Sequence, residues 1–239
     1  MIVIAKKFIK SFFKLIGLNI QKIPEHEKNK YLWLKDYSIN TVFDVGANEG
    51  QFALDIRQYL PAATIYLFEP LKDCFEVLTK RFKGDDKFFG FCVALGDKNE
   101  NTYIYRNEFS PSSSIQEMAD IHKDAFPFTK GVIKEEVSVE TLDNLIDKNN
   151  IELKDQVLLK LDVQGYEEKV LKGSEKTLEK VKIILTEVSF VELYKGQVLF
   201  EDLNNFIKSK GFNFYGCSNL LLNPKNGFPL QADAIFIKR

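Results

Sequence analysis

VFDVGANEG, at residues 42–50, is the stretch that decides the fold of this chain. A β-rich run reaches the acidic Asp44 and opens into a turn of the form D-x-G-x-N-x-G. A second apolar run, Ile65–Phe68, ends at Glu69. Carboxylates at the carboxyl ends of neighbouring strands in a parallel α/β sheet are typical of a site for a nucleoside with free ribose hydroxyls.

The same turn indicates which nucleoside cofactor to expect. A dinucleotide fingerprint, G-x-G-x-x-G, brings bare backbone N–H groups up to a pyrophosphate. Here Asn48 takes the second glycine position, and carboxylates stand at Asp44 and Glu49. Negative charge at this place opposes a diphosphate, and it suits a ligand with a sugar, an amino group and a sulfonium cation. The turn therefore favours S-adenosyl-L-methionine, and the alternative is an ordinary strand-to-helix turn capped by Asn48.

Length and composition fit a single catalytic domain of the α/β class. The chain has 239 residues with 45% hydrophobic residues, enough to fill one core under helices on both faces of a sheet. Its 34 acidic and 33 basic residues nearly cancel, which disfavours nucleic acid as a partner. Cys74, Cys92 and Cys217 have no metal-ligand spacing. They predict reduced core thiols in a cytoplasmic protein.

Only the N-terminus departs from this pattern, and we expect residues 1–30 to be a helix and linker ahead of a domain at 31–239. Residues 1–18 place lysines on one helical stripe and Ile and Phe side chains on another. The segment is too short and too charged to span a bilayer. Two interpretations stay open: peripheral contact with the inner face of a membrane, or packing on the domain or on a second subunit of a homo-oligomer.

Past the linker the chain alternates between strand and helix. Strands are predicted at Thr41–Val45, Thr64–Phe68, Phe88–Leu95, Val157–Leu161 and Val181–Leu185. Helices are predicted at Gln51–Tyr59, Leu71–Phe82, from Glu167, and at Phe200–Lys210. Asn213–Cys217 and Ala232–Lys238 are expected to close the sheet as an antiparallel hairpin.

A second cluster of polar residues, KLDVQGYEE at 160–168, also follows an apolar strand. The strand ends at Asp162, and the next one delivers Glu187 to the neighbouring position. Carboxyl ends of parallel strands share one edge of the sheet, so we expect Asp162 and Glu187 to face the same crevice as Asp44 and Glu69.

Seven motifs in order make the chain resemble a known family. They are FDVGANEGQFAL, IYLFEP, VALGDKN, a Ser-rich loop ending SSS, VETLDNL, LLKLDVQGYEEKVLKG and ILTEV, and they resemble the FkbM family of S-adenosylmethionine-dependent methyltransferases from about residue 40 onward. The resemblance implies the Rossmann-like class I methyltransferase fold: a seven-stranded, mostly parallel sheet in the order 3-2-1-4-5-7-6, with helices on both faces and an antiparallel last strand. It also implies methyl transfer to an oxygen, and the N-terminal segment resembles members associated with surface polysaccharides.

The resemblance also implies roles for individual residues. The methionine end of the cofactor would be held by Asp44, Gly46, Asn48 and Gly50. Glu69 would accept hydrogen bonds from the ribose hydroxyls, Ala94 and Leu95 would lie near the adenine, and Phe52 and Pro70 would supply apolar walls. Gln164 belongs to the same set, although the family usually has glutamate there, which weakens any role that needs a charge.

Methyl transfer to a hydroxyl needs a proton acceptor or a bound cation beside the acceptor oxygen. Asp162 is the first candidate for the base, with Glu187 beside it and His122 from the segment between strands. Alternatively, Asp162 and Glu187 share a divalent metal ion, and His122 is a solvated surface residue.

The segment from about 109 to 134 is expected to select the acceptor, because it alternates aromatic and basic residues: Phe109, His122, Lys123, Phe126, Phe128, Lys130 and Lys134. A hydroxyl on a sugar or glycan is the predicted acceptor, and a small secondary metabolite is the alternative. Two other classes remain open: an NAD-dependent oxidoreductase, which needs a glycine at position 48, and a non-catalytic Rossmann-like nucleoside-binding protein.

Overall fold

The computed structural model of the protein describes residues 29–107, 112–129 and 131–238. The chain divides into two compact units, Met1–Trp33 and Leu34–Arg239. The predicted basic helix at 1–18 lies outside the described residues, so its role stays a prediction. Every element that carries the site belongs to the second unit.

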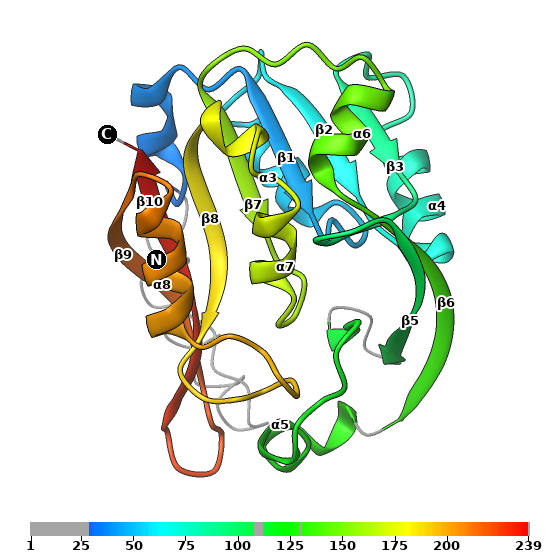
Figure 1. Cartoon of the computed structure of the whole chain (residues 1–239), viewed down its shortest axis with the longest axis vertical. Helices are drawn as coiled ribbons and strands as arrows, with labels where there is room; N and C mark the ends of the chain where they lie inside the picture. The colour runs from blue at the N-terminus through cyan, green and yellow to red at the C-terminus, as the bar shows by residue number, and fades with distance from the viewer. Residues whose placement is uncertain (1–28, 108–111, 130, 239) are drawn as a thin grey trace, which may run out of the picture. The chain divides into compact units, whose positions relative to one another are not determined.

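The described residues of this unit contain ten strands, and helices separate most of them (Figure 1). The strands are β1 Thr41–Val45, β2 Thr64–Phe68, β3 Phe88–Phe91, β4 Ala94–Leu95, β5 Glu100–Asn107, β6 Val132–Glu140, β7 Val157–Leu161, β8 Val181–Ser189, β9 Phe212–Leu222 and β10 Pro229–Lys238. The α-helices are α3 Gln51–Arg57, α4 Lys72–Arg81, α5 Asp120–Ala125, α6 Leu142–Lys148, α7 Glu167–Lys172 and α8 Phe200–Ser209, and the 3-10 helices are η1 Leu32–Tyr37, η3 Pro127–Thr129 and η4 Thr177–Glu179.

Seven of the strands form one sheet in the order β3-β2-β1-β7-β8-β10-β9. Neighbouring strands from β3 to β8 are parallel, whereas β10 runs antiparallel to both β8 and β9. In order of appearance the strands of this sheet follow 3-2-1-4-5-7-6, so the predicted fold class is confirmed. All parallel strands end at one edge of the sheet, and the candidate site lies at that edge.

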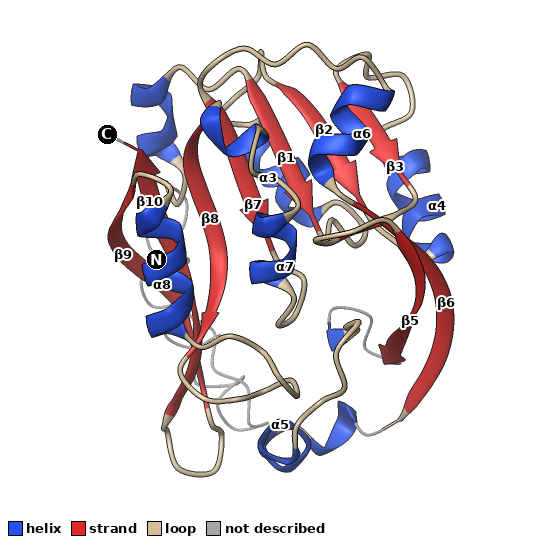
Figure 2. Ribbon diagram, viewed as in Figure 1, coloured by secondary structure: helices blue, strands red, loops and turns tan. Residues whose placement is uncertain are grey.

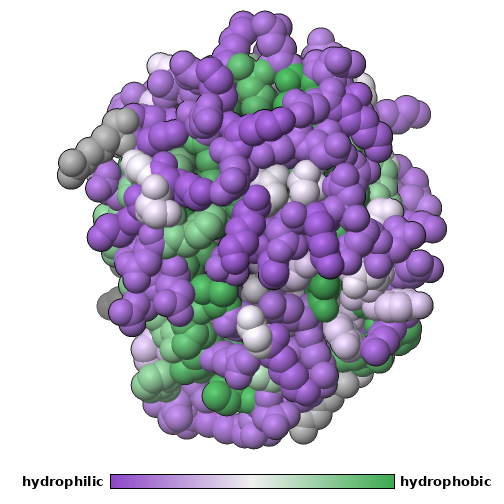
Figure 3. Space-filling view, in the orientation of Figure 1, coloured by the Kyte–Doolittle hydropathy of each residue, from purple (hydrophilic) through white to green (hydrophobic). Residues whose placement is uncertain are grey.

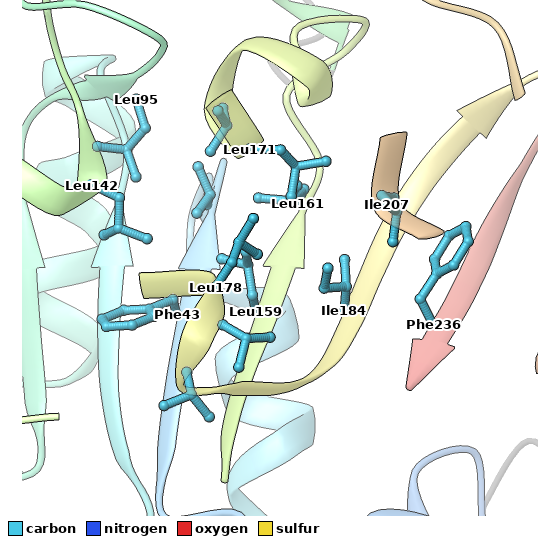
Figure 4. Close-up of a cluster of buried hydrophobic side chains, with 14 of the residues drawn as sticks. Phe43, Leu95, Leu142, Leu159, Leu161, Leu171, Leu178, Ile184, Ile207 and Phe236 are labelled. Atoms are coloured by element: carbon cyan, nitrogen blue, oxygen red, sulfur yellow. The ribbon is translucent and has the colours of Figure 1, made fainter. Parts of the chain in front are cut away.

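Helices cover both faces of the sheet (Figure 2). Buried side chains of α6, α7 and α8 pack on one face, where Figure 4 shows Leu142, Leu171 and Ile207 against Phe43 and Ile184 of the strands. The outer side of these helices is largely hydrophilic in Figure 3. This pattern is expected of amphipathic helices that turn their apolar stripe toward a core.

A second, three-stranded sheet was not predicted. Its order is β4-β6-β5, and it extends from the carboxyl edge of the main sheet at the lower right of Figure 1. The predicted single strand Phe88–Leu95 is wrong, because the chain leaves the main sheet after Phe91 and pairs Ala94 and Leu95 with β6. An apolar run long enough for one strand does not reveal that its two halves pair with different partners.

Two further expectations need correction. β8 continues to Ser189, so Glu187 lies inside the strand and faces Asp233 of β10. Cys74 is buried, but Cys92 and Cys217 are exposed, because Cys92 lies at the break between β3 and β4 and Cys217 lies on the edge strand β9. All three thiols are free.

Candidate active site

A cleft of about 660 Å³ opens at the carboxyl edge of β1, β2 and β7. The residues that line it are Val45, Gly46, Asn48, Phe68, Glu69, Pro70, Leu71, Val93, Ala94, Leu95, Ile104, Ser113, Ser114, Ile115, Asp162, Val163, Gln164 and Tyr166. The cleft thus combines the turns after β1, β2 and β7 with β4 and the segment that precedes α5.

Most of the residues predicted for the cofactor meet in this cleft. They are Gly46, Asn48, Glu69, Pro70, Ala94, Leu95 and Gln164, together with the catalytic candidate Asp162. The predicted residues that do not line it are Asp44, Gly50, Phe52, Glu187 and His122. The positions that follow a strand reach the cleft, whereas several of the positions within strands and helices do not.

Glu69 is the carboxylate at the end of β2, and the backbone holds it in place. The N–H of Asn48 donates to its Oε2 at 2.8 Å, and the N–H of Leu71 donates to its Oε1 at 2.8 Å. Asn48 adopts a left-handed backbone, φ 49°, which turns its N–H toward the carboxylate. Burial raises the pKa of Glu69 to about 7, against the opposing effect of these two hydrogen bonds. Each oxygen keeps a further lone pair for a ligand hydroxyl.

Gly46 lets the turns after β1 and β7 approach closely. Its φ is +73°, and a Cβ at this position would lie 1.9 Å from the carbonyl oxygen of Asp162. Only glycine satisfies both conditions without moving the backbone. Gly50 has a different role, since a Cβ there would meet the ring of Phe82 at 2.5 Å.

Asp44 lies beneath the cleft, in an ion pair with Lys160. The Lys160 Nζ is 2.9 Å from Asp44 Oδ1, 3.7 Å from Asp162 Oδ2 and 3.0 Å from the carbonyl oxygen of Gly46. Burial opposes the charge of Lys160, but the carboxylates of Asp44 and Asp162 raise its pKa above the ordinary value. Strand register explains the arrangement, because Asp44 is paired with Lys160 one residue before β1 ends. Contact of Asp44 with a ligand therefore stays a prediction, and the Phe52 ring lies 5.7 Å from the same ammonium group.

Lys160→Met is expected to destabilise the fold by about 3–5 kcal/mol, because it leaves the fully buried Asp44 as an uncompensated charge. The double variant Lys160→Met/Asp44→Asn removes that charge as well and should recover much of the loss. Urea unfolding of the three proteins measures the effect. If Lys160→Met alone is as stable as the double variant, the buried Asp44 does not need the charge of Lys160.

Asp162 and Glu187 are joined by the side chain of Gln164. Its Nε2 donates to Asp162 Oδ1 at 2.8 Å and to Glu187 Oε2 at 2.7 Å. The hydroxyl of Tyr194 donates to Gln164 Oε1 at 2.7 Å. Burial, and then the nearby charge of Asp162, raise the pKa of Glu187 well above its ordinary value. The expected proximity of the two carboxylates is therefore present, with Asp162 in the lining and Glu187 behind it.

His122 is buried in α5 and lies outside the cleft lining. Its ring packs edge-on against Phe126 and Tyr194, with centroids 5.5 and 5.2 Å apart. Burial lowers the pKa of His122. The alternative expectation, that His122 is a solvated surface residue, is wrong. α5 packs the His122 ring on Tyr194. Tyr194 lies between His122 and the Gln164 amide, so the structure does not bring His122 to the cleft.

The described lysines of the segment expected to select the acceptor contact residues outside the cleft. Lys123 lies 3.5 Å from Glu117, and Lys134 lies over the ring of Tyr105 at 5.1 Å. Phe109, Lys130 and the side chain of Phe128 are outside the described residues. In the described part of the chain, no group of three or more His, Cys, Asp or Glu side chains is arranged to hold a metal ion.

Sequence reasoning missed Lys160, Tyr194 and Ser114. Lys160 carried a usable signal, since it is the one charged residue in the otherwise apolar strand β7, VLLKL. Ser114 donates from its Oγ to the carbonyl oxygen of Gln164 at 2.6 Å. Neither Ser114 nor Tyr194 is near Gln164 in sequence, so only the fold reveals these contacts.

The family follows from a comparison with known domains. Residues 44–214 match the model of the methyltransferase FkbM domain. The chain belongs to this family. The match runs from the end of β1 into β9, so it contains every residue of the cleft described above.

Two individual relatives and one solved structure are also similar to this chain. The chain is 30% identical over 166 residues to the 2-O-methyltransferase NoeI of Sinorhizobium fredii, a match that covers 66% of each protein. It is 25% identical over 194 residues to the methyltransferase sdnD of Sordaria araneosa, covering 72% of this chain and 73% of sdnD. The structure of an FkbM methyltransferase from Methylobacillus flagellatus superimposes with a TM-score of 0.52 at 13% identity, over 84% of this chain and 44% of that one. This last likeness concerns the fold alone.

Proposed function

We propose that this chain is an S-adenosyl-L-methionine-dependent methyltransferase that methylates a hydroxyl oxygen of a sugar or glycan. The observation that carries the proposal is the pairing of Glu69 at the end of β2 with Asp162 at the end of β7, in one cleft of an FkbM domain. The name of NoeI, a 2-O-methyltransferase, supports oxygen as the methylated atom. A sugar acceptor rests on the sequence resemblance.

Each part of this cofactor has a candidate place in the cleft. The ribose hydroxyls would donate to Glu69, whose oxygens both face backbone donors and keep lone pairs for the sugar. The adenine would lie on Ala94 and Leu95, where the apolar lining includes Ile104 and Ile115. The methionine end would lie at the turn of Gly46 and Asn48, below Asp162. This placement needs no pyrophosphate site.

The bound cofactor supplies a methyl group already activated by a sulfonium, so the protein must align the acceptor and accept its proton. Alignment alone contributes up to about 7–11 kcal/mol to lowering a barrier of this kind. Asp162 lines the cleft and is the base in this proposal. Asp162 would accept the hydroxyl proton when the methyl group passes from the sulfur to the acceptor oxygen, so the products would be S-adenosylhomocysteine and a methyl ether. Gln164 and Lys160 each contact the Asp162 carboxylate and restrict its movement.

Calorimetric titration with S-adenosylhomocysteine and with NAD tests the cofactor. We expect binding of S-adenosylhomocysteine and none of NAD, because the turn after β1 carries Asn48 and Glu49 where a pyrophosphate would lie. Binding of NAD instead would favour an oxidoreductase. Binding of S-adenosylhomocysteine without methyl transfer to any sugar or small-molecule hydroxyl would favour a non-catalytic nucleoside-binding protein.

Peripheral membrane contact through residues 1–18 remains a separate proposal, which rests on the lysine and phenylalanine stripes of that segment. No helix in the described ranges combines the length and apolar character needed to cross a membrane. Flotation with anionic liposomes, with and without residues 1–17, tests the contact. Equal flotation of the two proteins would favour packing of the segment on protein.

A further inference from the structure

Three acidic residues lie in a row across β7, β8 and β10, and the first of them, Asp162, lines the cleft. β7 and β8 are paired so that Leu161 is opposite Thr186, which places Asp162 next to Glu187. Glu187 is opposite Asp233 on β10. Residues at one level of paired strands point to the same face of a sheet. Burial, and then the nearness of Asp162, raise the pKa of Glu187, so its neighbours determine how the two acids share this place.

The carboxamide of Gln164 is what lies between Asp162 and Glu187. Its Nε2 is within 2.8 Å of Asp162 and 2.7 Å of Glu187, so its two N–H bonds serve one carboxyl group each. If the amide were reversed, its oxygen would face both acidic groups. Its NH₂ group would then face the Tyr194 hydroxyl. In the orientation shown, the Tyr194 hydroxyl donates to Oε1 and the NH₂ group lies on the side of the two acids.

Neighbouring residues also hold the backbone of Gln164 in the conformation that directs its side chain to the two acids. Gln164 has φ 55°, a left-handed conformation that costs energy for a residue with a side chain. Ser114 compensates by donating from its Oγ to the Gln164 carbonyl oxygen at 2.6 Å. The carboxyl group of the buried Glu167 accepts hydrogen bonds from the N–H groups of Val163 and Gly165, one on each side of Gln164. Contacts from three segments therefore aim one side chain at the two acids.

We propose that the Gln164 carboxamide takes the place of a divalent cation between Asp162 and Glu187. Mg²⁺, Ca²⁺ and Mn²⁺ bind carboxylate and carbonyl oxygens, and an NH₂ group directed at the acids cannot serve as a ligand. The acceptor side of the cleft is thus built to work without metal, and Gln164 is a positioning residue for Asp162. The statement about Asp162 rests on the proposed function, whereas the statement about metal does not.

A change of one atom tests the inference. Gln164→Glu replaces the NH₂ by an oxygen and gives three carboxylates at one point, which is the kind of group that holds a divalent ion. Gln58→Glu is the matched control, because it adds the same charge at an exposed position at the end of α3. Manganese binding to the full-length wild type, Gln164→Glu and Gln58→Glu is measured by calorimetry and by the manganese EPR signal.

We expect Gln164→Glu to bind Mn²⁺ at least about 10-fold more tightly than wild type and Gln58→Glu, which should behave alike. Wild type that binds Mn²⁺ as tightly as Gln164→Glu would overturn the inference, as would a folded Gln164→Glu that shows no gain. Should Gln164→Glu be insoluble, Gln164→Asp serves for the same comparison.

Turnover provides a second measurement, which would not change if Gln164 had a purely structural role. Methyl transfer by wild type should be unaffected by EDTA, whereas Gln164→Leu should lower kcat with little change in the affinity for S-adenosylhomocysteine. Loss of wild-type turnover in EDTA would overturn the inference. Titration with S-adenosylhomocysteine distinguishes a failure of the proposed function from a failure of the inference about Gln164. If the protein does not bind S-adenosylhomocysteine but Gln164→Glu still gains affinity for Mn²⁺, only the proposed function is contradicted.

Discussion

Asp162→Asn is expected to reduce methyl transfer by about 10²-fold or more, while S-adenosylhomocysteine still binds within a few-fold. Asparagine keeps the shape of the side chain and an oxygen that can accept the hydrogen bond from Gln164 Nε2. It cannot accept the proton of the acceptor hydroxyl at neutral pH. Binding and turnover should therefore separate, which calorimetry and transfer of a labelled methyl group measure.

Asp86→Asn is the matched control for this prediction, because Asp86 is exposed and away from the cleft. It should leave both quantities at the wild-type value. If Asp162→Asn loses turnover only in proportion to its affinity for the cofactor, Asp162 is a cofactor ligand. Glu187, the other acid held by Gln164, would then be tested as the base.

Glu69→Ala should weaken binding of S-adenosylhomocysteine by about 10²-fold or more, since hydrogen bonds to a charged group contribute about 1.5–3 kcal/mol each. Two such bonds to ribose would be lost, together with the anchor for the N–H groups of Asn48 and Leu71. Glu76→Ala on the exposed side of α4 is the control. Unchanged affinity in a folded Glu69→Ala protein would contradict the proposed placement of the ribose.

The same carboxyl group predicts how cofactor binding varies with pH. Burial raises the pKa of Glu69 to about 7, so the group is largely protonated at pH 6 and largely ionised at pH 8. Ribose hydroxyls donate to the ionised form, so affinity should increase as the pH rises through 7 and binding near pH 7 should release protons. Glu69→Gln cannot ionise and should lose this dependence. Calorimetry in buffers of different ionisation enthalpy measures the released protons.

The sequence was sufficient for the main sheet because its signals are local. The runs at β1, β2 and β7 are apolar and end at turn residues, so their ranges were predicted as the structure has them. The order of the strands came from the family resemblance and is confirmed. Residues that follow strands, such as Glu69 and Asp162, were predicted to share one edge, because parallel strands place their carboxyl ends together.

The tertiary structure alone decided which side chains pair. Contact of Asp44 with the ligand stays a prediction, and only the register of β1 on β7 reveals that Lys160 is its partner beneath the cleft. His122 was a candidate base until the packing of α5 placed it behind Tyr194. Tyr194 reaches Gln164 from 30 residues away in the sequence. Hydrophobic periodicity determines which face of an element is buried, but contacts between distant segments depend on register and helix packing, which no local pattern encodes.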